Sequence, residues 1–198
     1  GYVSANWRNG SNISYSIGHF VDRVQLPFAL YLYTIDAVQY RGFNQRVDFG
    51  TPERKAIGLE GSYEVVQLFG GLVHQPSATV TARLGKHFTF RTTYTHLVGH
   101  FSDADERFSF GYANGNLDVA ITRNLAFDNL GRLDLSPGNE RVGLQSRVRW
   151  RFAPGSDLFV VYRWDQPLGL DPIDAAVRVP FHELTVKFTY YLRSFIDR

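Results

Sequence analysis

Arginines alternate with apolar residues between positions 141 and 152, and this stretch offers the most distinctive chemistry in the chain. The guanidinium groups of Arg147, Arg149 and Arg151 can pair with carboxylates or attract anions, and a dry core cannot hold them without such partners. Successive side chains of a β-strand point to opposite faces, so a strand here has one basic and one apolar face. The apolar face carries Val142, Leu144, Val148, Trp150 and Phe152. An apolar outer face and a charged inner face are typical of a strand in a transmembrane β-barrel.

Basic residues on neighbouring strands extend this polar side. The full set is Arg83, Arg91, Arg147, Arg149, Arg151, Arg163 and Lys187. We expect these residues to line the interior of a barrel, where their positive potential favours anions. The residues themselves favour the other interpretation, an internal network of salt bridges that fills a narrow barrel. Its carboxylate partners are Glu64, Asp118, Asp157 and Glu183.

Aromatic residues gather near the ends of the expected strands. The set is Trp150, Phe152, Tyr162, Trp164 and Tyr190. Tryptophan and tyrosine favour the membrane interface, where the ring is apolar and its tip is wet, so we predict an aromatic girdle. A soluble aromatic core is the alternative. Trp150 and Phe152 border the expected tight turn at 153–157, which favours the girdle.

The composition bounds the class of protein. The 198 residues include 16 Phe, 11 Tyr and 3 Trp, and the net charge is +2, which is too balanced to indicate a nucleic-acid-binding protein. No run of 18 apolar residues occurs, so the sequence predicts no helical membrane span. There are no cysteines, which excludes disulfides and thiolate metal sites. We predict no cofactor and no metal.

Apolar and polar residues alternate along most of the chain and show no helical periodicity, which predicts an all-β chain. We expect a single domain over residues 1–198, an antiparallel up-and-down transmembrane β-barrel of about ten strands, with eight to twelve allowed. A larger barrel, of which this chain forms part, is the alternative. The expected strands are 12–17, 28–40, 57–68, 79–84, 86–98, 107–112, 117–122, 141–152, 158–164 and 183–192, with a further one at 43–49.

The links between these strands predict which ends face which side of a membrane. Residues 85–86, 113–116 and 153–157 are expected tight turns, the second through its Asn-Gly pair. Residues 123–140 and 166–182 are expected long links. Bacterial outer-membrane barrels have short periplasmic turns and long external loops, so the tight turns are predicted to face the periplasm. The stretch 41–55 is too long for this pattern.

A catalytic interpretation depends on His96 and a nearby acidic run. Asp103 and Asp105 follow His96 and His100, and a histidine–serine or two-carboxylate site is conceivable there. The chain has no Gly-x-Ser-x-Gly elbow, no His-Glu-x-x-His pair and no phosphate-binding loop. Outer-membrane phospholipases place serine two residues after histidine, where this chain has Val98. A solvated acidic loop is the better interpretation, and we predict no catalytic residues.

The segment 141–164, followed by Leu-Thr-Val-Lys-Phe-Thr-Tyr-Tyr-Leu at 184–192, resembles a known bacterial family. It is similar to the C-terminal barrel domain of outer-membrane proteins that carry an N-terminal carbohydrate-binding module of the family-9 type. The resemblance implies a fold and a location, and no reaction. The end of this chain, at 193–198, departs from the terminal aromatic residue common in such barrels.

The sequence therefore predicts a barrel in the bacterial outer membrane that acts as a passive pore, or as a membrane anchor and passage. The lipid bilayer is the expected partner, a periplasmic or surface protein is a further one, and nucleic acid is not. A soluble lipocalin-like barrel that binds an apolar ligand is the main alternative, because such barrels turn their apolar faces inward. A surface hydrolase that uses His96 is the third hypothesis.

Overall fold

The computed structural model describes residues 1–30, 33–52, 56–101, 106–138, 140–168 and 179–191. These residues form strands joined by turns and loops. The described part of the chain contains no helix long and apolar enough to cross a membrane. The strands are β1 Tyr2–Asn6, β2 Asn12–Arg23, β3 Phe28–Leu30, β4 Tyr33–Ile35, β5 Gln39–Gly50, β6 Ile57–Leu68, β7 Gly71–Leu84, β8 Phe88–Phe101, β9 Glu106–Ala120, β10 Leu125–Asp134, β11 Arg141–Ala153, β12 Ser156–Pro167 and β13 Phe181–Thr189.

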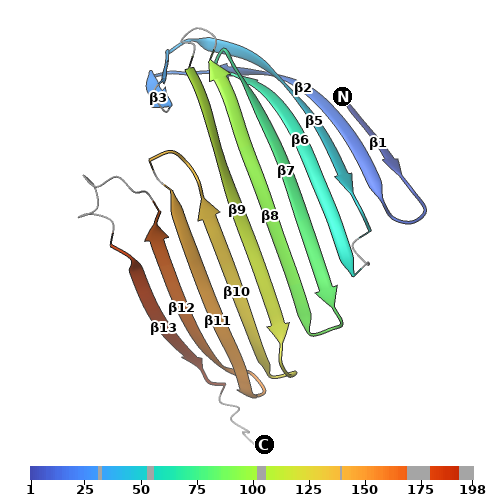
Figure 1. Cartoon of the computed structure of the whole chain (residues 1–198), viewed down its shortest axis with the longest axis vertical. Helices are drawn as coiled ribbons and strands as arrows, with labels where there is room; N and C mark the ends of the chain where they lie inside the picture. The colour runs from blue at the N-terminus through green and yellow to red at the C-terminus, as the bar shows by residue number, and fades with distance from the viewer. Residues whose placement is uncertain (31–32, 53–55, 102–105, 139, 169–178, 192–198) are drawn as a thin grey trace, which may run out of the picture. The chain divides into compact units, whose positions relative to one another are not determined.

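Eleven of these strands form one sheet in the order β1-β2-β5-β6-β7-β8-β9-β10-β11-β12-β13. Each strand lies beside the next one along the chain, apart from the separate β3–β4 hairpin inserted between β2 and β5 (Figure 1). This order confirms the predicted all-β, antiparallel, up-and-down class, and eleven strands fall within the expected range.

The chain divides into two compact units. The first comprises residues 1–81, 93–112 and 135–137, and it holds β1 to β6 with most of β7 and β8. The second comprises 82–92, 113–134 and 138–198, and it holds β10 to β13. Strands β7, β8 and β9 contribute residues to both units. The expectation of a single domain stays a prediction.

Two predicted links were wrong. The expected Asn-Gly turn at 113–116 lies inside β9, which runs without interruption through both strands expected at 107–112 and 117–122. Gly115 does not adopt the positive φ that a two-residue turn needs. The expected long link at 123–140 contains β10. The two errors cancel in strand count, so the turns after β7 and β11 still lie at the same end of the antiparallel array.

Boundaries near the N-terminus also differ from expectation. The strand expected at 28–40 is the hairpin of β3 and β4 followed by the start of β5. The long link expected at 41–55 holds most of β5, which confirms the strand suspected at 43–49. Strand β1 was missed, because its five residues are too short for alternation to be recognised.

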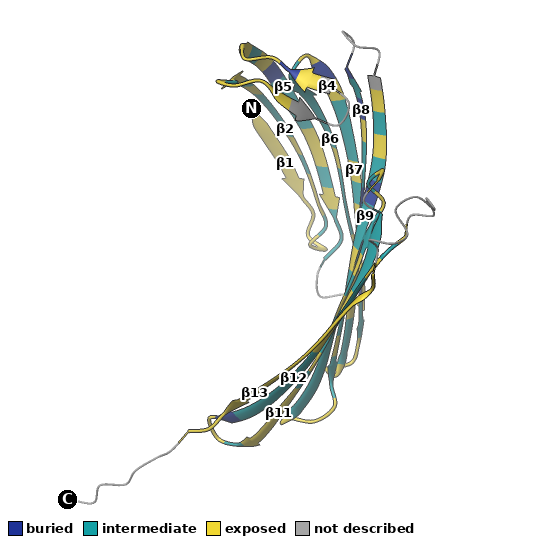
Figure 2. Ribbon diagram, turned by 90° about the vertical axis from the view of Figure 1, so that its left-hand side faces the viewer, coloured by how far each residue is buried: buried dark blue, intermediate teal, exposed yellow. Residues whose placement is uncertain are grey.

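Few hydrophobic side chains are buried in the described part of the chain. Ile35 and Phe101 are the hydrophobic residues found there with almost no exposed surface. The other buried side chains are small and polar: Thr79 shares a hydrogen bond of 2.8 Å with Thr93, and Thr95 shares one of 3.0 Å with Ser77. Figure 2 shows that β1 is exposed along its length, and β13 is likewise exposed throughout. The described residues therefore bury little apolar surface away from solvent.

Candidate functional site

Strands β10 to β13 of the second unit have two chemically distinct faces, which their register defines. Arg147 lies opposite Asp128 in β10 and Val161 in β12, and Val161 lies opposite Thr185 in β13. We call this side, with the even residues of β10 and the odd residues of β11 to β13, the polar face. The neighbouring row runs through Phe127, Val148, Val160 and Val186. We call its side the apolar face.

Three arginines of the predicted basic set, Arg147, Arg151 and Arg163, form ion pairs with carboxylates. Arg147 donates two hydrogen bonds to Asp128, from Nη2 at 2.7 Å and from Nε at 2.9 Å. Arg151 pairs with Asp157 at 3.3 Å. Arg163 pairs with Glu183 at 3.4 Å. Asp157 and Glu183 are among the carboxylates predicted from the sequence for a salt-bridge network, whereas Asp128 is not.

Other members of the predicted sets lie outside these strands. Arg83 lies in β7 and Arg91 in β8, and each has an interaction partner. In the first unit Glu64 pairs with Arg46 at 3.4 Å, so its partner is not one of the predicted lining residues. Whether the predicted basic set lines an interior stays a prediction.

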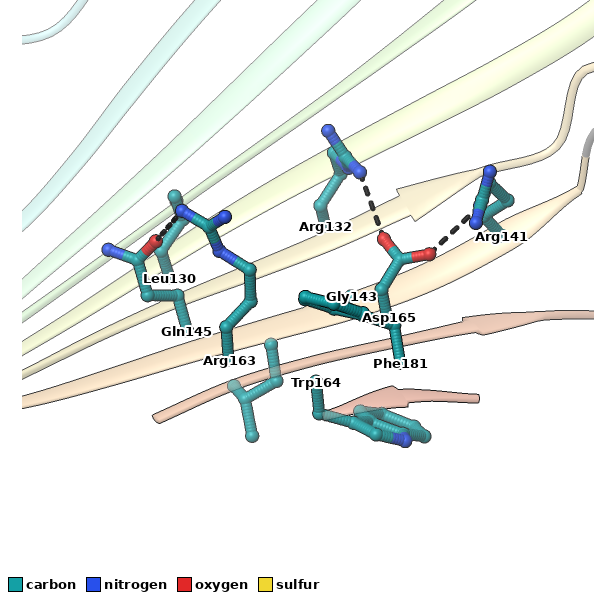
Figure 3. A pocket seen from close by; sticks show the side chains of 10 residues that line it. Leu130, Arg132, Arg141, Gly143, Gln145, Arg163, Trp164, Asp165 and Phe181 are labelled. Atoms are coloured by element: carbon teal, nitrogen blue, oxygen red, sulfur yellow. Dashed lines mark hydrogen bonds and ion pairs between the residues drawn. The ribbon is translucent and has the colours of Figure 1, made fainter. Parts of the chain in front are cut away.

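A pocket of about 500 Å³ opens on the polar face where Gly143 leaves the surface without a side chain. Arg132 Nη2 and Arg141 Nε donate to the two oxygens of Asp165, at 3.1 and 2.9 Å. Figure 3 shows these two arginines meeting the carboxylate from opposite sides, while the guanidinium of Arg163 turns toward Gln145. A side chain at position 143 would press on the Asp165 carboxylate, so the glycine makes room for this arrangement.

Two cations of the predicted set have no such partner. The side chains of Arg149 and Lys187 form no ion pair or hydrogen bond with any residue that the structure describes. Both lie in one register row, on either side of Phe159 in β12. Phe159 is an aromatic ring on the polar face, so this row combines two uncompensated positive charges with an apolar surface.

The predicted aromatic residues form two groups on the apolar face. Near the β11–β12 turn, Phe152 stacks on Phe188 with ring centroids 5.3 Å apart, and the Trp150 and Tyr190 rings lie 5.8 and 6.5 Å from that of Phe152. Toward the other end of β12 lie Tyr162 and Trp164. The Tyr162 hydroxyl shares a hydrogen bond of 2.8 Å with His182 Nδ1.

The spacing of these two groups is set by the strands. Trp150 lies opposite Leu158, and Leu144 lies opposite Trp164, six positions along β11. At about 3.4 Å per residue this places Trp164 about 20 Å from Trp150 along the strand direction. That distance is close to the height of the apolar band of an outer-membrane barrel, about 25 Å.

His96 is held by neutral partners. Its Nε2 shares a hydrogen bond of 3.1 Å with the Ser109 hydroxyl, and its Nδ1 shares one of 3.1 Å with the Tyr94 hydroxyl. Asp103 and Asp105 lie outside the described residues, and the described part of the chain has no metal-binding cluster of His, Asp and Glu. Tyrosine–histidine hydrogen bonds recur at Tyr63–His74 and Tyr162–His182, which favours a structural role for His96. Sequence reasoning missed these pairs because most of them join different strands.

No family model matches the chain, and no curated protein matches it. A solved structure described as NanC porin in a rhombohedral crystal form aligns with 94% of this chain and 90% of its own, at 11% sequence identity and a TM-score of 0.43.

Proposed function

We propose that this chain forms a β-barrel in the bacterial outer membrane and acts as a passive pore, or as a membrane anchor and passage, with a basic aqueous interior. The observation that carries the proposal is the apolar face of β10 to β13. Its apolar side chains align row by row across the strands and none of them is buried: Leu144 in β11 is 37% exposed, Tyr162 in β12 is 38% exposed and Leu184 in the edge strand β13 is 68% exposed. Such a face needs an apolar surrounding, which a bilayer supplies.

The opposite face supports an aqueous interior. Its arginines carry side chains that remain about half exposed even where they pair with carboxylates. Charged groups of this kind need water around them, because desolvation of an ion pair costs more than the pair returns unless its geometry is ideal. Lipid on the apolar face and water on the polar face satisfy both demands.

The lipocalin-like alternative places the apolar side chains inward, where closure buries them. In the described residues the buried hydrophobic side chains are Ile35 and Phe101, and neither belongs to β10 to β13. This supports the membrane interpretation over a soluble one. The relationship to barrel domains with a carbohydrate-binding module stays a prediction.

Two measurements test the proposal. The folded chain is expected to stay monodisperse only in detergent or lipid, and monodisperse protein in plain buffer would contradict the membrane location. In planar bilayers the pore form is expected to show stepwise ionic conductance. Membrane insertion without conductance would reject the pore and leave the anchor.

A further inference from the structure

We propose that Arg149, Phe159 and Lys187 form a binding site for a small organic carboxylate that carries an aromatic or similarly apolar body. This deepens the proposed pore, because it names the class of solute that the basic interior would hold. The site belongs to the second unit alone, on the polar face of β11, β12 and β13.

Arg149 and Lys187 lack counter-charges because the carboxylates near them already pair with other residues. The cations next to Arg149 on its own strand are Arg147 and Arg151, and both already hold a carboxylate, Asp128 and Asp157 respectively. Beside Lys187 on β13 the polar face carries Thr185 and Thr189, which are uncharged. The carboxylates facing this row are therefore committed elsewhere, and two positive charges remain without a counter-charge among the described residues. Both side chains are exposed, so an anion from solution has free access to them.

The separation of Arg149 and Lys187 suits one carboxylate held between them. Arg149 and Lys187 lie on strands separated by β12, so their Cα atoms are about 10 Å apart at about 4.8 Å per strand. Both side chains are long enough to converge above the intervening residue. A carboxylate there accepts hydrogen bonds from a guanidinium on one side and an ammonium on the other, and such charge-assisted bonds are the stronger kind.

Phe159 places an aromatic ring between Arg149 and Lys187. Phe159 is only partly exposed, and it lies on the same face as the ion pairs of Arg147, Arg151 and Arg163. An aromatic ring offers a flat apolar surface on which another ring can stack, which a chloride or acetate ion cannot use. The row therefore favours an anion with an apolar body over a small inorganic one, and benzoate is the simplest probe.

The test is calorimetric titration of benzoate into the full folded chain in detergent. Arg149→Gln and Lys187→Gln are each expected to weaken binding about fivefold, the value of one exposed ion pair. Phe159→Ala is expected to weaken benzoate binding and to leave acetate binding unchanged. Arg149→Lys and Lys187→Arg keep the charge and are expected to stay within about twofold of the parent.

Two controls make the result specific. The double substitution Arg151→Gln with Asp157→Asn removes a neighbouring matched ion pair without changing the net charge, and it is expected to leave benzoate affinity unchanged. Benzyl alcohol, which is uncharged, reports partition into the detergent and is expected to respond to none of the charge substitutions. Benzoate affinity that ignores Arg149→Gln and Lys187→Gln, or that falls equally in the Arg151/Asp157 control, would overturn the site.

The outcome is separable from that of the proposed pore. A chain that conducts ions in bilayers but binds benzoate without regard to Arg149 and Lys187 keeps the pore and rejects the site. A chain that binds benzoate as expected but never conducts keeps the site and rejects the pore.

Discussion

Asn129 is a polar residue on the apolar face, and its side chain is only half satisfied. Its Oδ1 accepts a hydrogen bond of 2.7 Å from the Ser146 hydroxyl, while its buried Nδ2 has no partner among the described residues. Ser146→Ala is expected to lower the free energy of unfolding by about 1–3 kcal/mol, because it strips the remaining partner from a desolvated amide. Urea titration of the chain in lipid vesicles measures this.

The matched control replaces both polar groups together. Asn129→Leu combined with Ser146→Val removes the unsatisfied amide and the hydroxyl at once, and it is expected to be neutral or stabilising. A double variant less stable than Ser146→Ala would contradict this explanation. It would also argue that water, and not lipid, reaches this part of the apolar face.

Gly61 allows a close approach of an aromatic ring on the neighbouring strand. Phe49 lies opposite it in the β5–β6 register, and a Cβ atom at position 61 would collide with the ring. Gly61→Ala is expected to destabilise the chain by about 1–3 kcal/mol through overpacking. In a Phe49→Ala background the same substitution is expected to cost much less, and a cost of equal size in both backgrounds would show that the ring is not responsible. The same urea titration gives all four values.

At the scale of the strand, single-strand alternation predicted the faces well. The pattern of β11 placed Arg147, Arg149 and Arg151 on one side and Val148 and Trp150 on the other, as the register shows. Alternation is a property of one strand, so it needs no knowledge of neighbours. Strand β10 escaped recognition because Asn129 and Gly131 interrupt its apolar side.

The pairing of charges could not be predicted from the same pattern. Arg149 and Arg151 are equivalent within β11, and they differ only because β12 places Phe159 opposite the first and Asp157 opposite the second. Register between strands depends on turn length and on the fit of many rows, which a single sequence does not reveal. The pocket at Gly143 was missed for the same reason, since it draws on four strands.

The orientation of β13 gives a sharp test of which face meets lipid. Val186 lies in the middle of the apolar face, and Thr185 is its neighbour on the polar face. Val186→Arg is expected to destabilise the membrane-inserted chain by about 2–4 kcal/mol, the cost of arginine near the bilayer midplane. Thr185→Arg adds the same charge to the same strand and is expected to change stability by less than about 1 kcal/mol. Refolding into vesicles at graded urea concentrations compares the two variants. A larger loss of stability for Thr185→Arg than for Val186→Arg would mean that the polar face, and not the apolar face, meets lipid.

At the scale of the whole molecule, the proposed membrane location requires that the backbone groups at both edges of the sheet be hydrogen-bonded. Strands β1 and β13 end the described sheet, and both are exposed along their full length. An unpaired backbone N–H or C=O group costs several kcal/mol in hydrocarbon, so a membrane-inserted form must pair every edge group. We predict that one copy of this chain closes the proposed barrel, because closure leaves no edge group unpaired.

One-copy closure predicts a resistant monomer. In dodecyl sulfate without heating, the folded chain is expected to migrate as a single band of a compact monomer. Every strand of a closed barrel is hydrogen-bonded on both sides, so the detergent finds no weakly held edge strand to unfold first. Boiling is expected to shift it to the mobility of a 22.6 kDa unfolded chain. Native mass spectrometry in mild detergent gives the copy number directly. A folded species that always contains several copies, or no resistant band at all, would mean that strands from outside this chain complete the wall.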